Sequence, residues 1–125
     1  DEGLPTRNWL HAEDTASAVI SIINSGKTNE TYNVAGGFEQ QNKETVKKVI
    51  EVFHGPEANW EDYVDLGFKR EGQDVRYDFS YSREGQDIRY ALNDDKLRAL
   101  GWKPQKVFNE EIHKVVQFYI DNFKW

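Results

Sequence analysis

Residues 7–26 read Arg-Asn-Trp-Leu-His-Ala-Glu-Asp-Thr-Ala-Ser-Ala-Val-Ile-Ser-Ile-Ile-Asn-Ser-Gly and predict the first helix of the fold. Asp14 stands at a typical N-cap position, because a carboxylate there can accept a hydrogen bond from a free backbone N–H. Gly26 is typical of a helix end. Between them the apolar residues recur at helical spacing and are Ala16, Val19, Ile20 and Ile23. We therefore expect a helix that follows Asp14 and ends at Gly26.

Apolar periodicity predicts three more helices. They are a helix after Asn42 that stops at Gly55-Pro56, a short helix over residues 94–100 that Asn93 caps, and a last helix over about residues 109–123. The apolar face of the last helix comprises Ile112, Val115, Val116, Tyr119, Ile120 and Phe123. A strand is expected at residues 31–34, just before the Gly36-Gly37 turn.

Residues 65–77 and 78–90 are two abutting copies of a 13-residue unit, and their shared part reads Arg-Glu-Gly-Gln-Asp-[Val/Ile]-Arg-Tyr. Apolar and polar residues alternate from Val75 to Ser82, which predicts β structure. We expect a β-meander with strands near residues 63–68, 75–81 and 88–92. Because the repeat length is odd, an unbroken strand would place the two copies on opposite faces. Either the glycine turns re-aim the second copy, or only one copy keeps the original role. Two arginines near a glycine turn suit a phosphate or diphosphate, which needs paired donors and close backbone approach.

The composition bounds the classes of function. A chain of 125 residues is one domain by size, with 14% aromatic and 30% charged residues, as in a folded globular protein. A net charge of -6 argues against broad binding to nucleic acid or to anionic membranes. No apolar run is long enough to span a bilayer, and without cysteine there is no disulfide or thiol chemistry. Together these features predict a mixed α/β domain, with three main helices and a short helix packed on a small mixed sheet.

The remaining local signals admit ordinary structural explanations. His11, His54 and His113 are far apart in sequence, so a metal site is not expected. Trp9 can anchor the core while Asp14 caps a helix, which would leave the preceding arginine as a surface residue. The chain has no methionine, which suggests a piece of a larger protein, although N-terminal processing or a tag is the alternative.

Five motifs, in order, resemble the C-terminal part of the dTDP-glucose 4,6-dehydratases, which are extended short-chain dehydrogenase/reductases. The motifs are the residue 7–18 run, Glu30-Thr31-Tyr32-Asn33-Val34-Ala35-Gly36-Gly37, Asn42, residues 83–92, and Lys96-Leu97 together with Leu100-Gly101-Trp102-Lys103-Pro104. The resemblance covers nearly the whole chain. It implies that residues 1–125 form a nucleotide-sugar-binding lobe of a cytoplasmic enzyme, without the N-terminal Rossmann domain that binds NAD.

The resemblance also implies the substrate-binding residues. Arg7 matches a nucleotide or diphosphate contact of the family, Arg83 matches a diphosphate contact, and Asn42 matches another substrate contact. Gln86 stands at a histidine of the family motif and Tyr90 at its closing tyrosine. In the first repeat copy, Arg70 with Tyr77 could take over the same role. Asn8, Glu84 and Gln86 depart from the family's aspartate, proline and histidine.

The catalytic parts of the family have no match in this chain. It has no glycine-rich dinucleotide fingerprint, and none of its six tyrosines is followed by a lysine four residues on. We therefore expect no cofactor and no catalytic residue here. The leading hypothesis is a lobe that binds a nucleotide-sugar diphosphate and works with a Rossmann domain. The alternatives are a homo-oligomeric binding module that has lost the enzymatic role, and a domain that merely folds.

Overall fold

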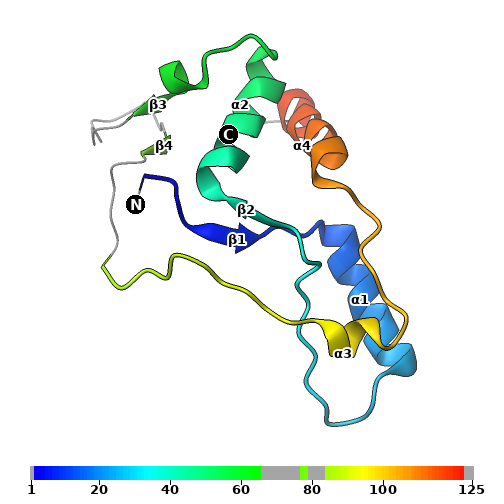
Figure 1. The fold of residues 1–125 in the computed structure, drawn as a ribbon. Coiled ribbons are helices and arrows are strands. Elements are labelled where there is room, and N and C mark those ends of the chain that lie inside the picture. The colour runs from blue at the N-terminus through cyan, green and yellow to red at the C-terminus, as the bar shows by residue number, and fades with distance from the viewer. Residues whose placement is uncertain (1, 66–76, 79–83, 123–125) are drawn as a thin grey trace.

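The computed structural model describes residues 2–65, 77–78 and 84–122 and shows a mixed α/β fold (Figure 1). Its elements in order are β1 (Thr6–Asn8), α1 (Ala12–Ser25), β2 (Glu39–Gln41), α2 (Asn42–His54), the 3-10 helix η1 (Trp60–Tyr63), β3 (Val64–Asp65), β4 (Tyr77–Asp78), α3 (Asp95–Arg98) and α4 (Phe108–Asn122). The fold class and the four α-helices of the prediction are confirmed.

Helix α1 begins three residues earlier than the sequence predicts. His11 is its N-cap, and the ring nitrogen Nδ1 accepts a hydrogen bond from the Glu13 amide at 3.0 Å. The prediction that Asp14 caps the helix is therefore wrong. Asp14 lies in the first turn, is buried, and accepts hydrogen bonds from the amides of Gln105 (2.9 Å) and Lys106 (3.0 Å). An aspartate so close to a helix start can serve as a cap or as an anchor for a distant loop, and local sequence does not separate these roles.

The ends of α1 and α2 agree with their glycine signals. Gly26 ends α1 and donates its amide to the carbonyl of Ile22 at 2.8 Å. Helix α2 begins at Asn42 itself, and Gly55 ends it with a φ of 100°, a conformation that favours glycine. Both helix predictions are confirmed to within three residues.

The strand predicted at residues 31–34 is not formed. This segment is extended, and its polar groups bond to side chains and backbone from around α3 instead of to a neighbouring strand. Asn33 Nδ2 donates to the carbonyl of Asn93 at 3.2 Å, and Lys96 Nζ donates to the carbonyl of Thr31 at 2.9 Å. A strand requires a paired strand beside it, and a β-prone run alone does not reveal whether one is present.

Two short strand pairs make up the sheets. Strands β1 and β2 are antiparallel, with Thr6 opposite Gln41 and Asn8 opposite Glu39. Strands β3 and β4 are parallel, whereas consecutive strands of the predicted meander would be antiparallel. In place of its third strand, residues 88–92 form an isolated parallel bridge between Thr6 and Arg89. The rest of the predicted meander lies outside the described residues.

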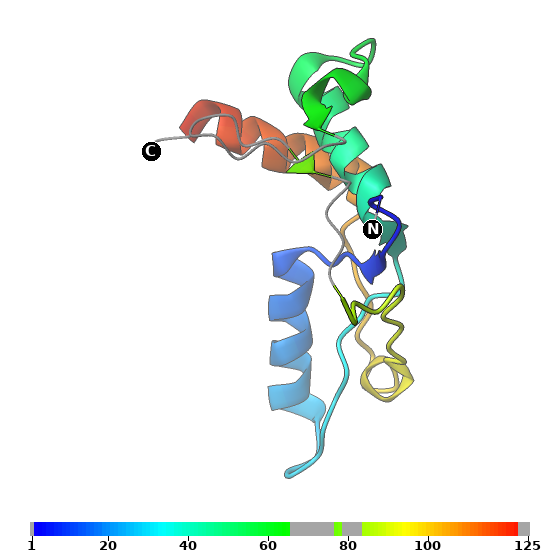
Figure 2. The ribbon, with the colours of Figure 1, turned by 90° about the vertical axis from the view of Figure 1, so that its left-hand side faces the viewer.

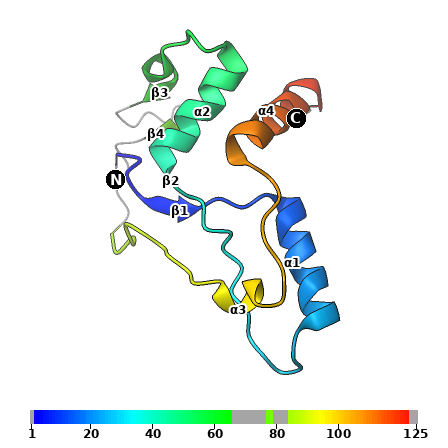
Figure 3. The same ribbon diagram turned by 45° about the vertical axis from the view of Figure 1, so that its right-hand side comes forward.

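The small core lies between α1 and α3. Ala18, Leu97 and Trp102 are buried there, and Trp102 Nε1 donates to the hydroxyl of Ser17 at 3.0 Å. In Figures 1 and 3 the β1–β2 pair lies between α1 and α3 at one end and α2 and α4 at the other. The strand pair is thus held from both ends.

The apolar faces predicted for α1 and α4 are largely exposed. Ile23 on α1 is 75% exposed, and Tyr119 on α4 is 58% exposed. Figure 2 shows both helices extending away from the strand pair, each with one side open. Helical periodicity identified these apolar faces, but the described part of the chain covers only a small part of them, such as Val116 on α4.

Candidate functional site

Arg7 lies in the middle of β1, and its side chain contacts the second repeat copy. Its guanidinium donates to the carbonyl of Asp87 from Nη2 at 3.0 Å and to the carbonyl of Ile88 from Nη1 at 3.4 Å. The same group lies over the ring of Tyr90, 4.5 Å from the ring centroid, which is a cation–π distance. Two segments that are distant in sequence therefore meet at one guanidinium.

Backbone hydrogen bonds hold the second repeat copy along β1. The Thr6 amide donates to the Ile88 carbonyl at 2.6 Å, and the Tyr90 amide donates to the Thr6 carbonyl at 3.3 Å. Asn8 adds a side-chain bond, because its Nδ2 donates to the Tyr90 carbonyl at 3.2 Å. An ionised aspartate at this position could not donate that bond, so the departure at Asn8 fits the local geometry.

A bidentate ion pair ties the same segment to β2. Arg89 donates to Glu39 through Nε and Nη2, both at 2.7 Å. The hydrogen bond from Arg89 lowers the pKa of the Glu39 carboxyl below its usual value. Nothing in the sequence indicates that these two residues form a pair. The only signal is that Arg89 belongs to the repeated unit.

A second polar cluster shapes the turn that leads into β2. Asp94 is buried and accepts hydrogen bonds from the Gly36 amide and from Arg98 Nε, each at 2.9 Å. Burial alone would raise the pKa of Asp94, but the hydrogen bonds from Arg98 and Gly36 outweigh it and the pKa is lowered. Arg98 also donates to the Gly36 carbonyl at 2.9 Å. Gly36 has a φ of 80°, and an added Cβ would lie 2.6 Å from Leu10 Cδ1, so both the backbone conformation and the packing favour glycine there.

The other predicted site residues are less closely gathered. Asn42 is half-buried at the first position of α2, and its amide donates to the Pro5 carbonyl at 3.0 Å, on the β2 side of β1. Gln86 is half-buried just before the segment that Arg7 contacts. Arg83 and Arg70 lie outside the described residues. Of the predicted site residues, Arg7 and Tyr90 are therefore in contact. Asn42 and Gln86 belong to the two segments that flank β1.

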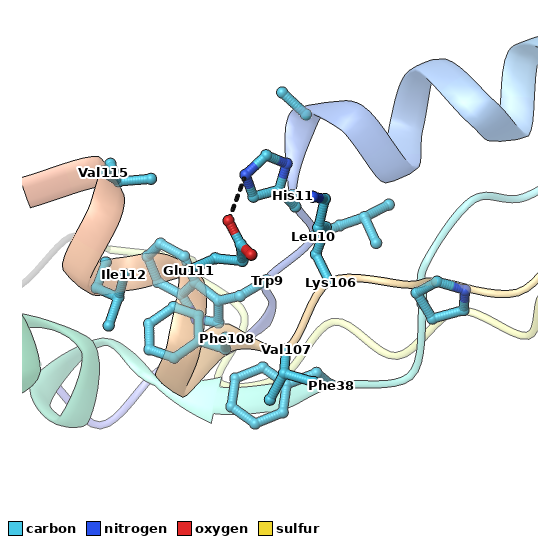
Figure 4. Close-up of a pocket in the computed structure, with 13 residues that line it drawn as sticks. Trp9, Leu10, His11, Phe38, Lys106, Val107, Phe108, Glu111, Ile112 and Val115 are labelled. Atoms are coloured by element: carbon cyan, nitrogen blue, oxygen red, sulfur yellow. Dashed lines mark ion pairs between the residues drawn. The ribbon is translucent and has the colours of Figure 1, made fainter. Parts of the chain in front are cut away.

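A cavity of about 400 Å³ lies elsewhere, between the start of α1 and the start of α4 (Figure 4). Its walls are mainly apolar, and the rings of Phe38 and Phe108 stack with centroids 5.2 Å apart. Lys106 at its wall pairs with Glu13 at 3.2 Å, and His11 Nε2 lies 3.6 Å from Glu111 Oε2. None of the predicted site residues lines this cavity, and its charged groups already face partners. The cluster at Arg7 is the better candidate for an anion.

Two further features are absent from the described ranges. No group of three or more histidine, aspartate or glutamate side chains there is arranged to hold a metal ion. Within the same ranges, no helix combines the length and the apolar character that crossing a membrane requires.

The chain is similar over nearly its whole length to known dehydratases. It is 34% identical over 128 residues to dTDP-glucose 4,6-dehydratase 1 of Escherichia coli K12, which covers 99% of this chain and 32% of that protein. It is 30% identical over 123 residues to the human dTDP-D-glucose 4,6-dehydratase, which covers 97% of this chain and 31% of that protein.

Solved structures of the same enzymes share the fold. The dTDP-glucose 4,6-dehydratase of Bacillus anthracis in complex with NAD matches with a TM-score of 0.72 and 28% identity, over 100% of this chain and 34% of that chain. The enzyme of Streptomyces venezuelae, with NAD and a second ligand bound, matches with a TM-score of 0.73 and 26% identity, over 98% of this chain and 33% of that chain.

The chain thus spans about a third of the length of the relatives that it matches. The resemblance inferred from the five sequence motifs is confirmed by these similarities. The sequence model described as GDP-mannose 4,6 dehydratase matches residues 1–115. On this evidence the chain belongs to the GDP-mannose 4,6 dehydratase family.

Proposed function

We propose that this chain is the nucleotide-sugar-binding lobe of a dTDP-glucose 4,6-dehydratase-like enzyme and contributes no catalytic group of its own. Its role is to position the substrate and to neutralise the diphosphate, while an NAD-binding Rossmann domain carries out the redox chemistry. The similarity to enzymes named for dTDP-glucose supports this substrate class. A cytoplasmic location, which the family resemblance implies, remains a prediction.

The observation that carries the proposal is which of the described arginines has a carboxylate partner. Arg89 is paired with Glu39, and Arg98 is paired with Asp94. Among the described residues, Arg7 bonds only to neutral backbone carbonyl oxygens and to an aromatic face. Its positive charge is therefore not compensated by a described carboxylate, which suits it to a phosphate oxygen.

The repeat supplies the second donor in this proposal. We assign the substrate-binding role of the family motif to the second copy, because residues of that copy contact Arg7. Arg83, which immediately precedes the described residues 84–90, would then add a second guanidinium beside the glycine turn. Arg70 of the first copy is the alternative donor. Asn42 and Gln86 would add neutral hydrogen-bonding groups.

A second candidate function is a self-associating binding module, and the exposed apolar helices favour it. Ile23 is 75% exposed and Phe118 is 59% exposed. Exposed apolar patches of this kind are usually covered by another protein surface. A Rossmann domain or a second copy of this chain could provide that cover. Whether the nucleotide binds decides between the two functions.

Calorimetric titration with dTDP and dTDP-glucose tests the proposal. We expect saturable binding, and we expect Arg7→Ala and Arg83→Ala each to weaken it by about tenfold or more, since a charged hydrogen bond contributes about 1.5–3 kcal/mol. Lys27→Ala is the matched control, because it removes an exposed positive charge at the end of α1. Absence of binding together with a stable dimer in light scattering would favour the module instead.

A further inference from the structure

We propose that Glu39 and Arg89 are positioning residues that hold the second repeat copy in register, so that Arg7 and Tyr90 present one face to the diphosphate. This inference rests on the proposed function, and it assigns a role to Arg89, the second arginine of the repeated unit. In this proposal Arg89 does not bind the substrate. It acts through the segment that it anchors.

The register of the strands places the ion pair and the cation–π pair on opposite faces. Glu39 lies opposite Asn8, and Arg89 is bridged to Thr6. Residues two apart on a strand share a face, whereas neighbouring residues point to opposite faces. Glu39 and Arg89 therefore meet over the Thr6 and Asn8 face of β1, and Arg7 points to the other face.

The same alternation explains why Tyr90 meets Arg7. Tyr90 follows Arg89 in the chain, so its side chain points to the face opposite the ion pair. Its ring centroid lies 4.5 Å from the guanidinium carbon of Arg7. A slip of the segment by one residue would exchange the faces of Arg89 and Tyr90. Such a slip would remove the ion pair and the cation–π contact together.

The ion pair is well suited to define register without dominating stability. It has two hydrogen bonds of 2.7 Å in the fork geometry of a guanidinium and a carboxylate, which fixes direction as well as distance. The Arg89 side chain is 60% exposed, and the Glu39 side chain is half-buried, at 29% exposed. Exposed pairs contribute little to global stability. The pair can therefore control one short segment and leave the remainder of the fold unchanged.

The chain contains a matched control pair. Lys96 and Glu30 also form an exposed ion pair between distant segments, with side-chain exposures of 50% and 43%. That pair joins α3 to the loop after α1, and none of the residues contacting Arg7 takes part in it. Glu30→Gln thus removes a comparable surface ion pair and leaves the Glu39–Arg89 pair intact.

Amide hydrogen exchange in the ligand-free chain tests the anchoring directly. In Glu39→Gln we expect the Tyr90 amide, which donates to Thr6, to exchange about threefold to tenfold faster, as the loss of a bidentate charged pair predicts. The amides of α1 should be unchanged, and the thermal midpoint should stay close to the wild-type value. Unchanged exchange at Tyr90, or equal acceleration in Glu30→Gln, would overturn the inference.

Nucleotide titration then links the anchor to the site. Glu39→Gln should weaken dTDP binding by about threefold to tenfold, whereas Glu30→Gln should leave it unchanged. The exchanged pair Glu39→Arg with Arg89→Glu should bring dTDP binding back to within about twofold of wild type, because the ion pair is re-formed. If the wild-type chain does not bind dTDP, the proposed function is refuted. The hydrogen-exchange rate of the Tyr90 amide would still decide whether the ion pair anchors the segment. If the wild-type chain binds dTDP and Glu39→Gln binds it equally well, only the positioning role is refuted.

Discussion

The guanidinium of Arg7 lies over the ring of Tyr90, 4.5 Å from its centroid, and the two residues come from segments that lie side by side only in the folded chain. This contact orients the cation beside the second repeat copy. An exposed cation–π pair is worth about 0.5–1 kcal/mol, so the pair is sufficient to bias the arginine side chain.

The aromatic ring of Tyr90 is expected to matter more than its hydroxyl. Tyr90→Leu should weaken dTDP binding by about twofold to fivefold, because the loss of a cation–π contact of about 0.5–1 kcal/mol frees Arg7. Tyr90→Phe is the control that keeps the ring and should bind nearly as well as wild type. Calorimetric titration measures both variants. Equal losses in the two variants would assign the effect to the hydroxyl instead.

The carboxylate of Asp14 should stabilise the fold through the loop before α4. Asp14→Ala leaves the amides of Gln105 and Lys106 without their acceptor and should destabilise the chain by about 1–3 kcal/mol. His11→Ala removes the observed N-cap bond and should cost about 0.5–2 kcal/mol. Urea unfolding measures both. A variant at Asp14 that unfolds like wild type would contradict this assignment.

Asp94 should make stability depend on pH in the acidic range. Its pKa in the folded chain is lowered, so its contribution is fully present above the ordinary aspartate pKa of about 3.9 and is lost as pH falls through the lower folded value. Asp94→Asn should therefore show a smaller loss of stability on acidification than wild type. Urea unfolding at a series of pH values checks this. Parallel curves for the two proteins would exclude Asp94 as the source.

Two glycines with positive φ should differ in their tolerance of a side chain. Gly101 has a φ of 94° and nothing within 4 Å of an added Cβ, so Gly101→Ala should cost about 1–2 kcal/mol of backbone strain. Gly36→Ala adds a close contact with Leu10 Cδ1, which should cost about 1–3 kcal/mol more. Thermal or urea unfolding compares the two variants. A larger loss at Gly101 would contradict the packing argument.

The exposed apolar helices should promote self-association of this chain. Ile23→Lys and Phe118→Lys place a charge on α1 and α4 and should each weaken any dimer by about tenfold or more, which corresponds to about 1.4 kcal/mol. Thr28→Lys introduces the same charge at an exposed polar site and serves as the control. Sedimentation velocity over a range of concentrations measures the effect. A wild-type chain that stays monomeric throughout would contradict this prediction.

Local patterns predicted most of the helices because the relevant interactions are local. Apolar residues at helical spacing and glycines at the ends, such as Gly26 and Gly55, depend on residues within a few positions. The prediction at residues 31–34 failed for the opposite reason. A strand exists only when another strand pairs with it, and the groups near Asn33 bond to the region of α3 instead.

The candidate site was predictable as a set of residue types but not as an arrangement. Arg7 and Tyr90 could be named from motifs that resemble a known family, although no local pattern predicts that they touch. The partnership of Glu39 with Arg89 was missed altogether, because an ion pair across strands is set by register. Arg83 and Arg70 remain predictions from the sequence.

The amino-acid order by itself determined where α1, α2 and α4 form, because helix formation depends on neighbours in the chain. It also determined the family, whose motifs are read directly from the order of residues. Only the tertiary structure decided that the described partners of Arg7 are neutral groups, whereas Arg89 is paired with the carboxylate of Glu39. That difference arises because strand pairing sends adjacent side chains to opposite faces, and pairing is a property of the folded chain.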